Sequence, residues 1–63
     1  MFATRLTTLR TARGLTQEAL AKKAQTTQPY VAALESGSQD NPTLDTVKRL
    51  AKALKCKVSD LVE

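Results

Sequence analysis

The feature that most constrains this chain is a pair of short helical segments with almost no chain between them. Residues 17–24 and 28–35 each predict a helix, and only Gln25, Thr26 and Thr27 separate them. A connection this short makes two helices cross steeply, and Ala21 supplies the small side chain that close packing near the turn requires. We therefore expect a compact unit whose second helix projects its first residues outward.

Apolar spacing predicts three further helices. Near the start of the chain, Phe2, Leu6 and Leu9 follow the i, i+4, i+7 spacing of one helical face. A fourth helix, opened by Pro42 and Thr43, has an apolar face made of Leu44, Val47, Leu50, Ala51 and Leu54. A short last helix over residues 58–62 closes the core with Val58 and Leu61. No segment alternates with period two, so the prediction is a single all-α domain of five short helices over residues 1–63.

Capping residues mark where these helices begin and end. Thr16 is the predicted N-cap of the second helix, and Gly14 and Gly37 suit left-handed helix ends. The cap of the third helix falls on Thr27 or on Gln28, because Pro29 disfavours helical geometry in the residue before it. A cap at Thr27 starts the helix at Gln28, whereas a cap at Gln28 starts it at Pro29.

Composition removes several function classes. The 63 residues contain one cysteine and no histidine, which excludes an intrachain disulfide, a zinc site and an imidazole base. We expect no metal, no cofactor and no enzymatic activity. No apolar run approaches the roughly 20 residues that span a bilayer, so we expect no membrane contact and a cytoplasmic location. The net charge of +4 favours a polyanionic partner only weakly.

Five ordered segments give the chain a family resemblance. They read LTQEALA at residues 15–21, TQPYV at 27–31, LESG at 34–37, PTL at 42–44 and LAKAL at 50–54. In this order and spacing they resemble the helix-turn-helix family of lambdoid phage repressors and Cro proteins, with the helix-turn-helix core at residues 17–36. The resemblance implies a nucleoid-associated transcriptional regulator, a repressor in many relatives, that binds double-stranded DNA as a homodimer on a palindrome. An alternative is an antitoxin-type module that binds a protein partner and also binds DNA to regulate its own expression.

The resemblance also assigns DNA contacts. Gln28 matches a base-reading position, since a glutamine amide can pair with adenine, and the other positions facing the bases are Pro29, Ala32 and Ala33. Small apolar side chains offer a thymine methyl contact but no bidentate pair, so we expect thin direct readout supplemented by DNA shape. The residues implied in phosphate contact are Thr16, Gln17, Thr27, Tyr30, Ser38, Gln39, Asn41 and Arg10.

Further positions carry structural expectations. Arg10 and Glu35 match a structural ion pair, and the implied dimer contact comprises Pro42, Leu61 and Val62. Gln25 and Lys55 stand where the family usually has glycine, so we expect the two turns to differ in detail from the family pattern. The basic residues near the fourth helix read as a solvated face: Lys48, Arg49, Lys52, Lys55 and Lys57.

Overall fold

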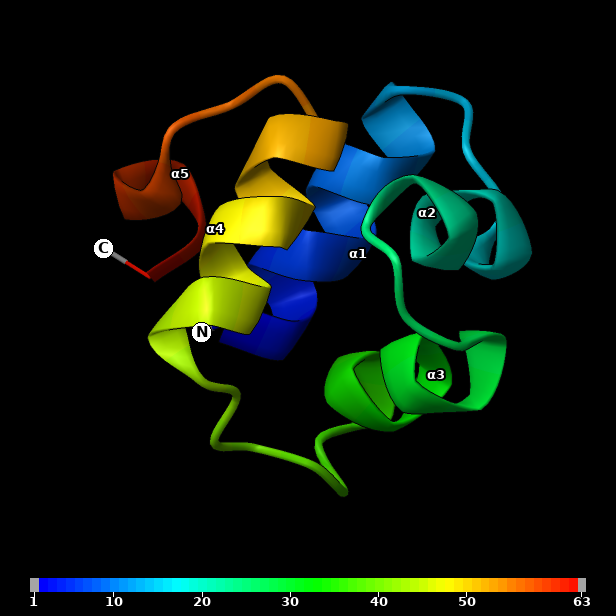
Figure 1. Ribbon diagram of the computed structural model, residues 1–63, viewed down its shortest axis with the longest axis vertical. Helices are drawn as coiled ribbons and strands as arrows, with labels where there is room; N and C mark the ends of the chain where they lie inside the picture. The colour runs from blue at the N-terminus through cyan, green and yellow to red at the C-terminus, as the bar shows by residue number, and fades with distance from the viewer. Residues whose placement is uncertain (1, 63) are drawn as a thin grey trace.

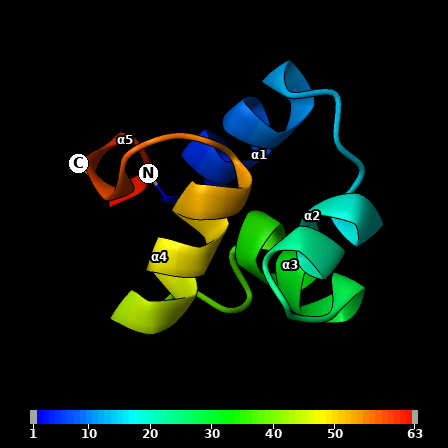
Figure 2. The ribbon, with the colours of Figure 1, turned by 45° about the horizontal axis from the view of Figure 1, so that its top comes forward.

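The computed structural model of the chain describes residues 2–62 and confirms an all-helical fold. The helices are α1 (Phe2–Ala12), α2 (Gln17–Lys23), α3 (Gln28–Ser36), α4 (Leu44–Ala53) and α5 (Val58–Val62). Helix α2 packs against both α3 and α4, while α1 packs against α3 and α5 (Figures 1 and 2). No strand occurs between residues 2 and 62.

One core joins the five helices, and each contributes a leucine to it. Leu6, Leu20, Leu34, Leu50 and Leu61 come from successive helices, and each is at most 1% exposed. The apolar spacing seen in the sequence therefore identifies the buried faces of the helices correctly.

Leu44 is the exception, because its side chain is 62% exposed and lies outside the core. It is the first residue of α4, and side chains on a helix lean toward the helix N-terminus. At this position the lean carries Leu44 past the edge of the core. Its predicted place on the buried face of the fourth helix is therefore wrong.

Threonine caps begin the three central helices. The hydroxyl oxygen of Thr16 accepts a hydrogen bond from the backbone N–H of Ala19 at 3.0 Å. That of Thr27 accepts from Tyr30 at 3.3 Å, which decides between the two predicted caps of α3 in favour of Thr27. Thr43 caps α4 in the same way. Each cap satisfies a backbone donor that the helix leaves unpaired.

Left-handed residues follow the first four helices. Gly14 and Gly37 adopt φ values of 70° and 87°, as expected for glycine. Gln25 and Lys55 adopt φ values of 60° and 56° at equivalent places after α2 and α4. The expectation that these two turns would differ from the family pattern is therefore wrong. Both residues adopt the left-handed backbone conformation that glycine would have there, despite its strain.

An arginine supports each of these two strained turns. Arg13 donates to the carbonyl oxygens of Leu54 at 2.7 Å and Lys55 at 3.1 Å. Arg49 donates to the carbonyl oxygen of Gln25 at 3.5 Å. These bonds help to hold a backbone conformation that costs a non-glycine residue roughly 1 kcal/mol.

Candidate nucleic-acid interface

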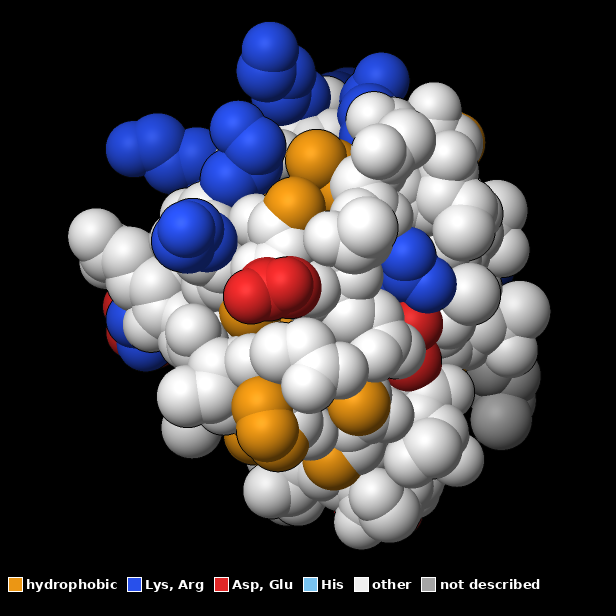
Figure 3. All heavy atoms as spheres, turned by 90° about the vertical axis from the view of Figure 1, so that its right-hand side faces the viewer, with side chains coloured by type: hydrophobic (Ala, Val, Ile, Leu, Met, Phe, Trp, Pro, Cys, Tyr) orange, Lys and Arg blue, Asp and Glu red, His pale blue; other side chains and the backbone are white. Residues whose placement is uncertain are grey.

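The candidate base-reading residues lie on the outer surface of α3. Gln28 and Pro29 are exposed at the start of the helix, and Ala32 and Ala33 are partly exposed one turn later. Figure 3 shows this side of the molecule, with acidic side chains near its middle, hydrophobic side chains in its lower half and most basic side chains gathered at the upper left. Among these four candidate residues Gln28 is the polar one, and the other three are small and apolar.

A continuous chain of hydrogen bonds links Gln28 to a buried ion pair. Arg10 Nε lies 2.6 Å from Glu35 Oε2, with the two side chains 15% and 7% exposed. Gln17 Nε2 donates to Glu35 Oε1 at 3.1 Å. Gln28 Nε2 then donates to Gln17 Oε1 at 2.8 Å. The predicted Arg10–Glu35 pair is present, and Gln17 braces Gln28 from α2.

The ion pair fixes which way each amide points. The ionised Glu35 carboxylate only accepts hydrogen bonds, so Gln17 must turn its NH₂ group toward it. The Gln17 carbonyl oxygen then faces Gln28, which must in turn offer its own NH₂ group. Gln28 is left with a free carbonyl oxygen and one free N–H, the acceptor and donor that adenine N6 and N7 require.

The surroundings of Glu35 favour its charged form. Burial alone raises the pKa of this carboxyl group, but hydrogen bonds from Arg10 and Gln17 and the positive charge of Arg10 outweigh it. The net effect is a pKa below the ordinary value of 4.5. Glu35 therefore remains an acceptor at neutral pH, as the amide orientation requires.

Candidate phosphate-contact residues lie at the starts of α2 and α3 and in the loop after α3, around Gln28. Thr16 and Thr27 are exposed, and because each hydroxyl oxygen accepts a capping bond, its O–H can still donate outward. Ser38, Gln39 and Asn41 are exposed in the loop after α3. Tyr30 is partly buried with its side chain packed against the core. The structure thus brings the hydroxyls of two helix starts and one polar loop around the outer surface of α3.

Two predicted contacts need correction. Arg10 uses its guanidinium inside the protein, because besides Glu35 it donates to the carbonyl oxygen of Leu15 at 2.7 Å. It is structural, and a phosphate contact is not supported. Leu61 is fully buried in the core and cannot supply a dimer surface, whereas Val62 is 48% exposed and Pro42 partly exposed.

Sequence reasoning missed the structural work of two arginines. The sequence pattern gives Arg13 no structural role and predicts that Arg49 lies on a solvated face. Both instead support strained turns, and Arg49 also pairs with Asp45 at 2.9 Å. The i, i+4 spacing of Asp45 and Arg49 signals that ion pair, but no sequence spacing signals a bond from an arginine to a distant carbonyl.

Three further observations limit the site. Among residues 2–62 no helix is long and apolar enough to cross a membrane. Within the same range, His, Cys, Asp and Glu side chains form no group of three or more suited to a metal ion. Cys56 is partly buried, and burial raises the pKa of its thiol, with the charge of Asp60 acting in the same direction.

The chain is similar in sequence to a curated regulator. It is 42% identical over 59 residues to the HTH-type transcriptional regulator DdrOP3 of Deinococcus deserti. The match covers 94% of this chain but 45% of the relative, so the chain spans less than half the length of that protein.

Two solved structures have the same fold. The restriction-modification controller protein C.AhdI from Aeromonas hydrophila matches with a TM-score of 0.91 and 40% identity, over 95% of this chain and 89% of that one. SinR, a master regulator for biofilm formation solved in complex with DNA, matches with a TM-score of 0.96 and 25% identity over the full length of both chains. A helix-turn-helix family model also matches residues 6–61. The chain therefore belongs to the helix-turn-helix family and shares its fold with these two solved structures.

Proposed function

We propose that this chain is a sequence-specific DNA-binding domain of a transcriptional regulator, which reads the major groove with α3. The observation that carries the proposal is the bond chain from Arg10 and Glu35 through Gln17 to Gln28. It holds an exposed amide in a single orientation at the start of an outward-facing helix. A protein that needed only a soluble surface would gain nothing from ordering an exposed glutamine in this way.

In this proposal Gln28 reads an adenine through its free carbonyl oxygen and remaining N–H. Pro29, Ala32 and Ala33 form a small apolar surface that accepts thymine methyl groups. Because this surface has few donors, part of the specificity comes from the shape and deformability of the DNA.

The DNA backbone is held on both sides of the reader. The start of α3 offers backbone N–H groups and the Thr27 hydroxyl to one phosphate. Thr16 and Gln17 approach the backbone from the start of α2, and the loop with Ser38, Gln39 and Asn41 approaches it beyond the end of α3. These contacts set the register of α3 in the groove and carry no sequence information themselves.

We further propose that the protein binds as a dimer to a palindrome and represses transcription, in the cytoplasm and in association with the nucleoid. Among residues 2–62 the large apolar side chains left exposed are Leu44 and Val62, on two helices that pack together. Exposed apolar side chains of this kind favour a protein contact. The proposed dimer surface therefore centres on Leu44 and Val62, with Pro42 beside them.

Selection from a random duplex library, followed by footprinting at stated salt, tests the function. The proposal predicts an enriched sequence with two inverted half-sites about 10 bp apart, each with an adenine opposite Gln28. The Gln28→Ala variant serves as the matched control, and its selected pool should lose that adenine while keeping the spacing. A pool no more enriched than the input would contradict DNA reading, and protection of one unrepeated half-site would contradict the dimer.

A further inference from the structure

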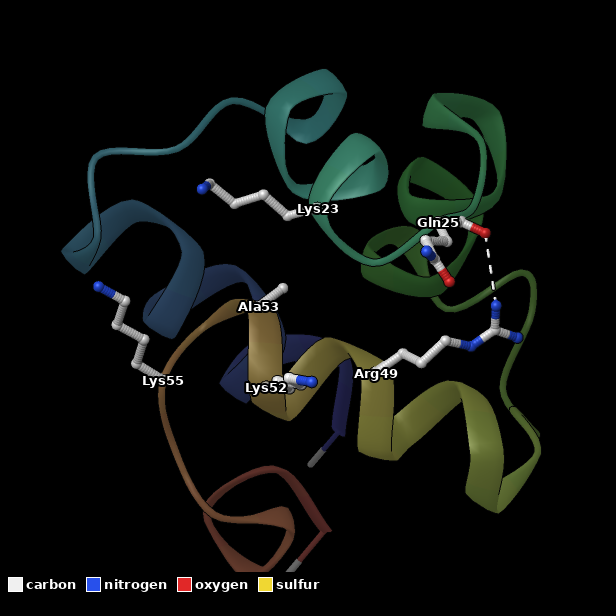
Figure 4. A pocket seen from close by; sticks show the side chains of 6 residues that line it. All are labelled: Lys23, Gln25, Arg49, Lys52, Ala53 and Lys55. Atoms are coloured by element: carbon white, nitrogen blue, oxygen red, sulfur yellow. Dashed lines mark hydrogen bonds between the residues drawn. The ribbon is translucent and has the colours of Figure 1, made fainter.

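A second feature lies between the C-terminal ends of α2 and α4, away from the reading residues. There the surface is hollowed into an open depression of about 370 Å³, lined by Lys23, Gln25, Arg49, Lys52, Ala53 and Lys55. Figure 4 shows the lining side chains coming from α2 and the turn after it, and from α4 and the turn after it. None of the residues assigned to DNA contact lines it.

The lining of this depression is strongly positive. Four of its six residues are lysine or arginine, and none of the six is acidic. The Asp45 carboxylate pairs with one edge of the Arg49 guanidinium, with Oδ2 2.9 Å from Arg49 Nη2. Arg49 Nε is buried and has no hydrogen-bond partner among the described residues. Gathering like charges around one space costs free energy that a bound anion would recover.

Backbone strain marks the same place. The non-glycine residues with a left-handed backbone, among residues 2–62, are Gln25 and Lys55, and both line the depression. Glycine would occupy either position without strain, as Gly14 and Gly37 do elsewhere in the chain. Strained residues cluster where a side chain is needed for function. Here the two strained residues place an amide group and an ammonium group at the rim of one positive depression.

Lysines near a helix C-terminus also neutralise the helix dipole, and this explains part of the arrangement. It explains neither the strain at Lys55, where a glycine ends a helix equally well, nor the amide of Gln25, which carries no charge. An anion in the depression would explain both side chains, because it would attract the Lys55 ammonium group and accept a hydrogen bond from the Gln25 amide.

We propose that this depression is a binding site for a phosphate-bearing anion with at least two adjacent phosphate groups. Lys23, Lys52 and Lys55 would surround the phosphate oxygens, and the Gln25 amide would donate from the rim. Three lysines and an amide spread around one space offer more donors than a single phosphate needs and suit a diphosphate or a short polyphosphate. This proposal is independent of base reading by Gln28, because the two sites share no residue.

Binding of inorganic pyrophosphate, measured by titration calorimetry at constant ionic strength, tests the site. The wild-type chain should show one saturable site, and Lys52→Gln should weaken it about tenfold through the loss of one charge-assisted contact. Lys48→Gln is the matched control, because it makes the same change one turn earlier on α4, at an exposed residue outside the lining. Lys55→Gly should weaken binding similarly while leaving the protein folded.

The phosphate can belong to a free ligand or to the DNA backbone, and a second measurement separates these sources. If pyrophosphate does not saturate, but Lys52→Gln weakens binding to a random duplex more than Lys48→Gln does, the phosphate belongs to DNA. If pyrophosphate saturates and the two variants bind the duplex equally, it belongs to a free ligand. Equal behaviour of Lys52→Gln and Lys48→Gln in both assays would overturn the site, whether or not Gln28 reads DNA.

Discussion

The reading surface, made of Gln28, Pro29, Ala32 and Ala33, and the basic depression lie near opposite ends of α2. Their polar groups differ in how completely they are hydrogen-bonded. At the start of α2, every nitrogen of the Arg10 guanidinium has a partner, and the bond chain continues without a gap to Gln28. Beyond its end, positive side chains surround an open space, and Arg49 Nε has no partner among the described residues. The comparison indicates that the reading surface is organised for geometry and the depression for charge.

The comparison extends to the backbone. The reading helix begins at an ordinary threonine cap and ends at a glycine, so its geometry costs little. The turns that border the depression contain Gln25 and Lys55 in left-handed conformations. The reading helix therefore needs no strained residue to position its side chains, whereas the turns that border the depression contain strained residues whose side chains line it.

The largest effect expected is the loss of the ion pair beneath the reading surface. Glu35→Ala leaves the Arg10 guanidinium largely buried without its carboxylate, and should lower the free energy of unfolding by about 3 kcal/mol. Urea denaturation measures this loss. Asp40→Ala is the control, since it removes the same charge from an exposed loop and should change stability by less than about 0.5 kcal/mol. If Glu35→Ala changed the free energy of unfolding as little as Asp40→Ala does, the ion pair would contribute little to stability.

The pH dependence of stability should show a smaller effect of the same pair. Folding lowers the pKa of Glu35, so the ionised carboxylate contributes its full share to the free energy of unfolding above the ordinary carboxyl value of 4.5. That share is lost as the pH falls from this value through the lower pKa of the folded state. The stability difference between the wild type and Glu35→Gln should therefore shrink on acidification. Denaturation curves at pH 7 and in steps below pH 4.5 measure the trend, and a constant difference would contradict it.

Substitutions in the two strained turns should raise stability, in contrast to the loss expected for Glu35→Ala. Lys55→Gly and Gln25→Gly each relieve a left-handed non-glycine residue, and should raise the free energy of unfolding by about 0.5–1 kcal/mol. Gly37→Ala is the inverse control and should lower it, because it introduces the same strain at φ 87°. Thermal unfolding without added phosphate measures all three. A destabilised Lys55→Gly would show that its side chain contributes more to folding than the strain costs.

Much of the fold could be predicted from the sequence, because local patterns determine it. The threonines at positions 16 and 27 and the apolar spacing of residues 47, 50 and 54 specify helix starts and buried faces directly. The Arg10–Glu35 pair was accessible only through the family resemblance, since its partners lie 25 residues apart. Family knowledge thus supplied what local pattern could not.

Other features depend on three-dimensional proximity and escaped prediction. Whether Leu44 or Leu61 is exposed depends on where each helix ends relative to the core, which apolar spacing does not specify. The basic residues of the fourth helix read as a plain solvated face, because the sequence does not show that Lys23 and Gln25 lie across from them. The roles of Arg13 and Arg49 as supports for distant carbonyl groups were invisible for the same reason.

The central claim is that Gln17 acts on DNA reading through Gln28, and a double-mutant cycle tests it most directly. Affinities for the selected duplex and for random DNA should be measured for the wild type, Gln17→Ala, Gln28→Ala and the double variant. Gln28→Ala should cost about 1–3 kcal/mol on the selected duplex and little on random DNA. The double variant should lose less than the sum of the two single losses, by about 1 kcal/mol, because the brace has no effect once the reader is gone. Losses that add to within about 0.3 kcal/mol would show that the two glutamines act independently, and would contradict the account.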